Sequence, residues 1–120
     1  MSARFTLPSS LRIQHRRDFT RLKQSGSRRT RQGLVLNWVE LPADSKPRLG
    51  LITTRKLGPA VVRNRCRRLL REAFRLNRPL LRPAELVLVA RGALVGKSFA
   101  AVQAEYLALL RDAGLLNSQS

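Results

Sequence analysis

Residues 55–78, which read RKLGPAVVRNRCRRLLREAFRLNR, decide the fold of this chain. Pro59 follows a glycine and suits the first turn of a helix, whereas Pro79 lies just beyond the segment and ends it. The segment therefore predicts a helix over residues 59–77. Successive residues turn by roughly 100° around a helix axis, so that one side of this helix is apolar. That side carries Val62, Cys66, Leu69, Leu70 and Ala73.

The opposite side of the predicted helix is strongly basic. Residues 55–78 contain nine Lys and Arg residues and a single acid, Glu72. Solvated helix faces usually mix the two signs, because like charges four residues apart repel each other by roughly 0.2–0.5 kcal/mol. We therefore interpret this side as a surface whose guanidinium groups bind a phosphate backbone. The row consists of Asn64, Arg68, Arg71 and Arg75, flanked by Arg65 and Arg67.

The whole chain carries a large excess of positive charge. Its 120 residues include 24 Lys and Arg and 7 Asp and Glu, so that the formal net charge is +17. Such an excess repels itself and requires a polyanionic partner. Twenty of the basic residues are Arg, whose planar guanidinium binds phosphate through two hydrogen bonds and stacks on bases. Nucleic acid is therefore a better partner than a membrane surface or an acidic protein.

Length and composition predict one domain of residues 1–120 with an aliphatic core, since 43% of the residues are hydrophobic and 5% are aromatic. We expect residues 1–15 to form a flexible basic arm and residues 115–120 a frayed tail. Neither a signal peptide nor an apolar run long enough to cross a membrane is visible in the sequence. The single cysteine, Cys66, cannot form an internal disulfide. These features predict a cytoplasmic protein.

The other elements follow from turn residues and hydrophobic periodicity. We expect a first helix over residues 18–24, ended by Gly26, and a last helix that begins at Ser98 and ends at Gly114. Strands are predicted over residues 28–31, 34–41, 48–54 and 85–90. The third strand is expected to be the antiparallel neighbour of the second. The order αβββαβα predicts an α/β fold of the α+β type, a two-layer sandwich with a sheet of about four strands and three helices.

The basic segment resembles the signature of a known protein family. The run RKLGPAVVRNR at residues 55–65, followed by RRLLREAF at residues 67–74, is closely similar to that of the protein subunit of bacterial ribonuclease P. Shorter matches lie at residues 17–19, 48–51 and 85–91. The resemblance extends over most of the chain, from about residue 12 to residue 110.

The resemblance implies a protein that works as part of a ribonucleoprotein enzyme. In this family the protein binds a catalytic RNA subunit and the single-stranded 5′ leader of precursor tRNA. It assists the endonucleolytic cut that removes the leader and produces the mature 5′ end of the tRNA. The RNA subunit carries out the hydrolysis with magnesium ions. The resemblance therefore implies no catalytic residue, bound cofactor or metal ligand in the protein itself, and neither DNA nor a membrane as a partner.

The resemblance also assigns residues to two binding surfaces. The RNA subunit is expected to contact Arg63, Asn64, Arg65, Arg67 and Arg68. A cleft between the first helix, the sheet and the basic helix is expected to hold the leader. The residues expected to face that cleft are Phe19, Arg55, Lys56, Arg68 and Arg71.

Some positions depart from the family pattern. Lys23 and Asn37 stand where the family usually has aromatic side chains, so base stacking on the leader is expected to be weaker here. Trp38 follows Asn37, but alternation along a strand directs it to the opposite face and predicts a core residue. The family also has a left-handed crossover between two parallel strands, whereas the general rule for such strands favours the right-handed form.

Other kinds of protein share parts of this pattern. A ribosomal-type protein that holds RNA without turnover would show the same charge and the same helix, and a groove for one strand beside Phe19 and Lys56 would distinguish the two. A protein-only nuclease needs tuned acid–base groups, yet His15 is the only histidine and the acids are scattered. Residues 92–98, GALVGKS, resemble a phosphate-binding loop, but Arg91 holds the place of its first glycine. We interpret that segment as a turn.

Overall fold

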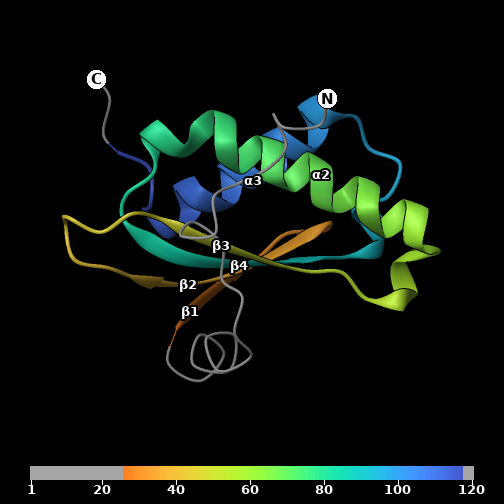
Figure 1. Ribbon diagram of the computed structural model, residues 1–120, viewed down its shortest axis with the longest axis horizontal. Coiled ribbons are helices and arrows are strands. Elements are labelled where there is room, and N and C mark those ends of the chain that lie inside the picture. Colours follow the sequence, from red (N-terminus) through yellow and green to blue (C-terminus); the bar gives the residue numbers. More distant parts are fainter. Residues whose placement is uncertain (1–25, 118–120) are drawn as a thin grey trace.

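Four strands form a single twisted sheet in the computed structural model, which describes residues 26–117 (Figure 1). Helices α2 and α3 lie side by side on one face of that sheet. The two layers confirm the predicted fold class. The strands are β1 (Ser27–Thr30), β2 (Leu34–Glu40), β3 (Arg48–Ile52) and β4 (Ala84–Ala90), and the helices are α2 (Ala60–Asn77) and α3 (Phe99–Ala113). Short 3₁₀ helices connect them: η3 (Arg55–Leu57), η4 (Arg78–Leu80) and η5 (Gly92–Leu94).

The predictions for the two ends of the chain have different outcomes. The predicted arm of residues 1–15 and the predicted helix over residues 18–24 lie outside the described residues. The expectation of a frayed tail is wrong for its first part, because Leu115 is fully buried and its carbonyl accepts a 2.7 Å hydrogen bond from the Arg82 amide. Gly114, with φ +73°, turns the chain back after α3 and brings Leu115 into the core.

The prolines and caps define both helices as predicted. Pro59 is the N-cap of α2, and the helix ends at Asn77 before the Pro79 turn. At the start of α3, the Ser98 hydroxyl accepts a 3.2 Å hydrogen bond from the Ala101 amide. A serine in this position satisfies one of the amide groups that a helix leaves without a partner at its first turn.

The strand order is β1-β2-β4-β3, and it corrects one sequence prediction. β3 is not the antiparallel neighbour of β2; it pairs in parallel with β4, and β4 pairs antiparallel with β2. β4 reads AELVLVA and is buried on both faces. A central position in the sheet therefore removes more apolar surface of β4 from water than an edge position would. The hairpin expected between β2 and β3 is therefore opened by the insertion of β4.

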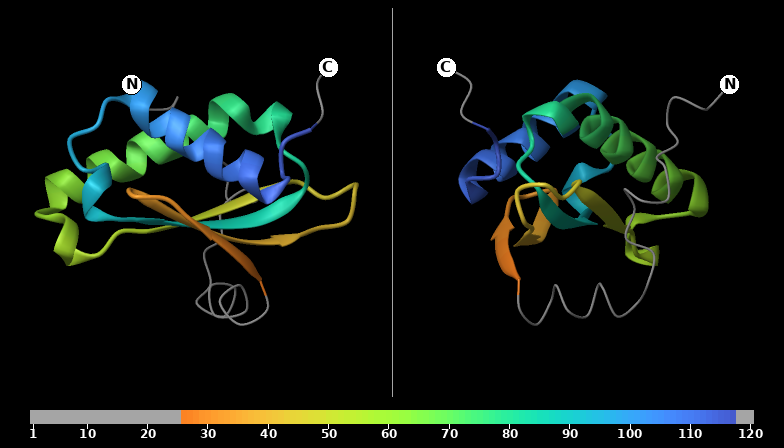
Figure 2. Two further views of the ribbon diagram at one scale, coloured as in Figure 1. Left: turned by 180° about the vertical axis from the view of Figure 1, so that it is seen from behind. Right: turned by 60° about the vertical axis from the view of Figure 1, so that its left-hand side comes forward.

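The connection β3-α2-β4 is left-handed. Figure 1 shows both strands running in the same direction beneath α2, and Figure 2 shows β1 at the front of the sheet when the molecule is seen from behind. The strand order places β3 at the edge opposite to β1, with β4 beside it. When the sheet is viewed from the helix side with β3 and β4 pointing away from the viewer, β4 lies to the left of β3. The expectation from the family resemblance is confirmed, and the general preference for right-handed crossovers is wrong for this chain.

The core lies between the sheet and the two helices. Leu36 and Trp38 of β2 point into it and meet Phe74 of α2 and Tyr106 of α3, all of which are buried. Trp38 is thus a core residue, as predicted. Glu85 of β4 lies on the other face of the sheet, where its carboxylate, 3% exposed, pairs with Arg48 of β3 at 2.8 Å. Both faces of the central strands are therefore buried.

Candidate nucleic-acid interface

The outer side of α2 carries an exposed basic stripe. Asn64, Arg65 and Arg68 are exposed, and they lie opposite the residues that fix the helix to the core. Those buried residues are Cys66, Leu70, Ala73 and Phe74. The predicted division of α2 into an apolar side and a basic side is confirmed, because this helix packs on the sheet through residues spaced three and four apart.

A second group of arginines lies along the border of the buried side. Arg63, Arg67 and Arg71 are half-buried. The sequence placed Arg71 in the exposed row, but its position around the helix is closer to Arg67 than to the outermost residue, Arg68. The Arg67 Nη1 donates a 3.0 Å hydrogen bond to Asn64 Oδ1, which orients both side chains. Within residues 26–117, the buried Arg63 Nε has no hydrogen-bond partner.

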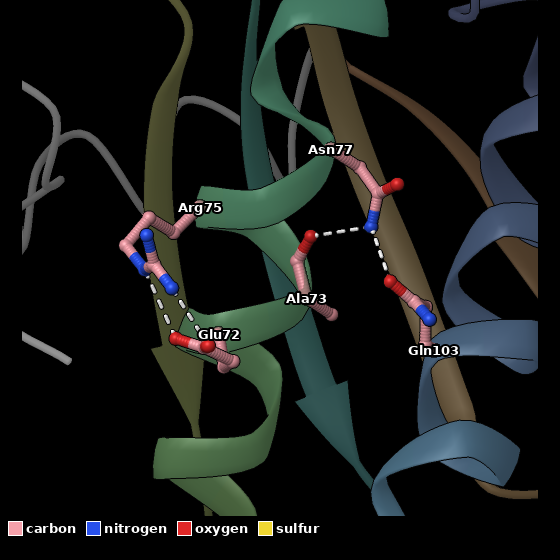
Figure 3. A network of polar contacts seen from close by, with 5 residues as sticks. All are labelled: Glu72, Ala73, Arg75, Asn77 and Gln103. Atoms are coloured by element: carbon pink, nitrogen blue, oxygen red, sulfur yellow. Dashed lines mark hydrogen bonds and ion pairs between the residues drawn. The ribbon is translucent and has the colours of Figure 1, made fainter. Parts of the chain in front are cut away.

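Arg75 behaves differently from the other arginines of α2. Its Nε and Nη2 donate to the two carboxylate oxygens of Glu72 at 3.0 and 2.7 Å (Figure 3). The hydrogen bond to Glu72 raises the pKa of Arg75 above its usual value. The sequence predicted that Arg75 belongs to the row of phosphate-binding residues. In the structure its guanidinium instead binds Glu72, the only acid of the helix. The basic stripe is therefore widest in the first half of α2.

A polar bridge holds the end of α2 against α3. The Asn77 Nδ2 donates at 2.8 Å to the Ala73 carbonyl and at 2.8 Å to Gln103 Oε1 of α3 (Figure 3). Side-chain bonds between helices limit how far α2 can rotate about its axis. The bridge thus helps to keep the basic stripe turned away from the core.

Two further cations precede α2 directly. Arg55 and Lys56 lie in η3 and are exposed, while Leu57 between them and the helix is buried and anchors the turn. The first turn of α2 has neither a side-chain cap nor an acidic residue. Because the amide groups of a first turn carry partial positive charge, this end of α2 adds to the attraction that Arg55 and Lys56 exert on an anion.

Four other residues singled out in the sequence are Phe19, Lys23, Asn37 and Cys66. Phe19 and Lys23 lie outside the described residues, so their positions in a leader cleft stay predictions. Asn37 lies on the sheet face opposite the helices and is 9% exposed. Cys66 is buried, and burial raises the pKa of its thiol, which fits the predicted core role better than that of a nucleophile.

The loop that resembles a phosphate-binding loop has a structural role. The Lys97 Nζ donates a 2.8 Å hydrogen bond to Glu105 Oε1, so its ammonium group is held by α3. Gly96, with φ +85°, makes the turn that places Ser98 at the N-cap of α3. Across residues 26–117 there is no group of three or more His, Cys, Asp or Glu side chains that could hold a metal ion.

Comparison with known proteins agrees with this geometry. The family model for ribonuclease P matches residues 7–114. The chain belongs to the ribonuclease P protein family. The ribonuclease P protein component of Desulfovibrio desulfuricans is 41% identical over 112 residues, which cover 90% of this chain and 86% of the relative.

Solved structures of the ribonuclease P protein family share the fold. The Staphylococcus aureus protein has a TM-score of 0.82 at 25% identity, with 89% of this chain and 98% of that chain covered. The Thermotoga maritima protein has a TM-score of 0.76 at 29% identity, with 84% and 96% covered. Among residues 26–117 of this family member, neither helix combines the length and apolar composition that a membrane crossing requires.

Proposed function

We propose that this chain is the protein component of a ribonuclease P ribonucleoprotein. It binds the catalytic RNA subunit and the single-stranded 5′ leader of precursor tRNA, and it assists removal of the leader to give the mature 5′ end. In this proposal the RNA subunit carries out the hydrolysis with magnesium, and the chain supplies binding groups. Family membership and the stripe on α2 support it together. Residues 1–120 act as a single RNA-binding domain in the cytoplasm.

One observation carries the proposal: the outer side of α2 exposes Arg65 and Arg68 to solvent, and the single acid of the helix pairs with Arg75. Arg65 and Arg68 lie on the exposed side within one helical turn of each other. Guanidinium groups so spaced can reach successive phosphates of one strand, and each phosphate neutralised releases a counterion. Phosphate contacts of this type fix the position of a folded RNA without reading its sequence.

The residues divide between two ligands. We propose that the RNA subunit contacts the exposed stripe and its border, and that the leader lies at the start of α2. Arg55 and Lys56 are exposed at that start, and Arg68 and Arg71 lie further along α2. The RNA-subunit set is Arg63, Asn64, Arg65, Arg67 and Arg68, and the leader set is Phe19, Arg55, Lys56, Arg68 and Arg71.

Reconstitution with the ribonuclease P RNA of the same organism and a precursor tRNA tests this function. The chain is expected to increase cleavage at the mature 5′ end at low magnesium, and to cut nothing without the RNA. The variant R65E/R68E should lose most of the stimulation while keeping its helical circular dichroism, because both side chains are exposed. An equal stimulation by R65E/R68E would contradict the assignment of α2. No stimulation by the unmodified chain would contradict the proposed function.

A matched control separates specific contacts from net charge. Lys46 lies in the turn before β3 and Arg82 between η4 and β4, and both are exposed. The variant K46E/R82E changes the net charge by the same amount as R65E/R68E but leaves α2 intact. It should retain most of the stimulation. A ribosomal-type protein would bind RNA and be sensitive to the same charges, yet it would not change the rate of leader removal.

A further inference from the structure

A second group of exposed cations lies on β1, away from α2. Within residues 26–117, β1 is an edge strand that pairs only with β2, and all four of its residues are exposed. Figure 2 shows β1, in orange, at the edge of the sheet opposite α2. Arg28 and Arg29 are consecutive, so their side chains leave the strand on opposite faces. The edge is therefore positive on both of its faces.

Arg29 is held in place by its neighbours. Its Nη1 donates a 2.9 Å hydrogen bond to the Arg28 carbonyl, and its guanidinium carbon lies 5.6 Å from the centre of the Trp38 ring. A guanidinium over an aromatic ring is attracted to the ring face. Because the side chain is already ordered, less conformational entropy is lost when a further acceptor binds to its remaining N–H groups.

The charges of Arg28 and Arg29 are not compensated by acids of the described chain. Within residues 26–117 neither side chain forms an ion pair, whereas the nearby Arg31 lies 3.3 Å from Asp112. The buried or half-buried acids are used elsewhere: Glu72 pairs with Arg75, Glu85 with Arg48, and Glu105 with Lys97. The edge thus keeps its positive charge in a molecule that already repels itself.

We propose that the edge of β1 is a second RNA-binding surface, which contacts the sugar–phosphate backbone through Arg28 and Arg29. The proposal rests on the proposed function in taking RNA as the polyanion. Strands β2 and β4 separate β1 from β3, so the two edges lie about 14 Å apart at the usual strand spacing. In this proposal two separate RNA segments, one on α2 and one on β1, bind the same chain.

Protection of the sheet edge is the competing explanation for these cations. Charged side chains on edge strands prevent edge-to-edge pairing of sheets, and either sign of charge serves this purpose. Only phosphate binding requires positive charge. The variant R28E/R29E keeps the edge charged and reverses its sign, so it separates the two roles. R28E alone leaves the contact of Arg29 with Trp38 intact and serves as a variant without any change in the core.

The stoichiometry of a short hairpin RNA on the full chain, measured by sedimentation at physiological salt, tests the proposal. The unmodified chain and the control K46E/R82E should bind two hairpins, and R28E/R29E should bind one. R28E should weaken the second binding event. The slope of log affinity against log salt for that event should fall by about 0.9 in R28E, since roughly 0.9 is lost for each phosphate contact removed.

The outcomes distinguish this inference from the proposed function. A single hairpin on the unmodified chain, or two on a folded R28E/R29E, would overturn the second surface while leaving stimulation of cleavage by α2 untouched. Self-association of R28E/R29E is not expected, because its edge stays charged. If R65E/R68E also keeps both hairpins and full stimulation, the α2 assignment fails independently of the β1 edge.

Discussion

Replacement of Glu105 by alanine is expected to destabilise the fold more than the loss of an exposed ion pair does. Its Oε2 accepts a hydrogen bond of 2.6 Å from the buried Gly33 amide, and its Oε1 accepts one of 2.8 Å from Lys97. One carboxylate, 9% exposed, thereby joins the turn between β1 and β2, the loop before α3 and α3 itself. Loss of this group leaves the Gly33 amide without an acceptor in a buried position.

The magnitude follows from the two contacts. A hydrogen bond to a charged group contributes about 1.5–3 kcal/mol, and the Gly33 bond is of this kind. The pair with Lys97, whose side chain is 33% exposed, contributes up to about 1 kcal/mol after solvent screening. Glu105→Ala should therefore lower the free energy of unfolding by about 2–4 kcal/mol. Glu105→Gln should cost less, because the amide oxygen can still accept from Gly33.

Urea denaturation followed by Trp38 fluorescence measures these changes, since Trp38 is the only tryptophan and is buried. Asp112→Asn is the matched control on the same helix: it removes the exposed pair with Arg31 and should cost less than about 0.5 kcal/mol. A loss of under about 0.5 kcal/mol in Glu105→Ala, or equal losses in the Ala and Gln variants, would refute the assignment of the Gly33 bond.

Three other changes test separate parts of the structure. Phe19→Ala should weaken binding of a single-stranded leader oligonucleotide by about 1–3 kcal/mol if one base stacks on the ring, and unchanged anisotropy titrations of the folded variant would remove Phe19 from the leader surface. Burial raises the pKa of the Cys66 thiol, so a disulfide reagent should modify it only as fast as the chain unfolds; immediate modification of the native protein would contradict its burial. Asn77→Ala and Gln103→Ala should each cost roughly 1 kcal/mol of unfolding free energy, and the double variant should cost less than the sum, whereas strictly additive losses would show that the bridge is not formed in solution.

Local signals in the sequence predicted the elements well. Pro59 and Pro79 bracket α2, Ser98 and Gly114 bracket α3, and the continuous apolar run of β4 correctly indicated a strand buried on both faces. Such signals act through backbone dihedral angles and through hydrogen bonds between residues that are close in the sequence. They are therefore visible without knowledge of the tertiary structure.

Contacts between distant residues could not be predicted in the same way. The pairing of β3 with β4 depends on which strand buries most apolar surface in a central position of the sheet. Hydrophobic alternation alone does not show which strand that is. The placement of Arg29 over Trp38 and the bond between Gly33 and Glu105 join residues 9 and 72 positions apart. The spacing of these residues carries no periodic signal. The binding roles of the α2 residues came from family resemblance, and the structure adds which of them are exposed.

The ion pair between Arg48 and Glu85 bears on how the parallel strands find their alignment. The two residues are direct partners in the β3–β4 ladder, and Glu85 is almost fully buried. A slip of one residue would move every side chain of β3 to the other face and carry Arg48 away from the carboxylate. Such a slip takes one ion-pair partner away from a buried carboxylate, which is unfavourable in a small domain of limited stability. The pair therefore favours the native register of β3 on β4. It destabilises misaligned folding intermediates when these two strands, which α2 separates in the sequence, come together.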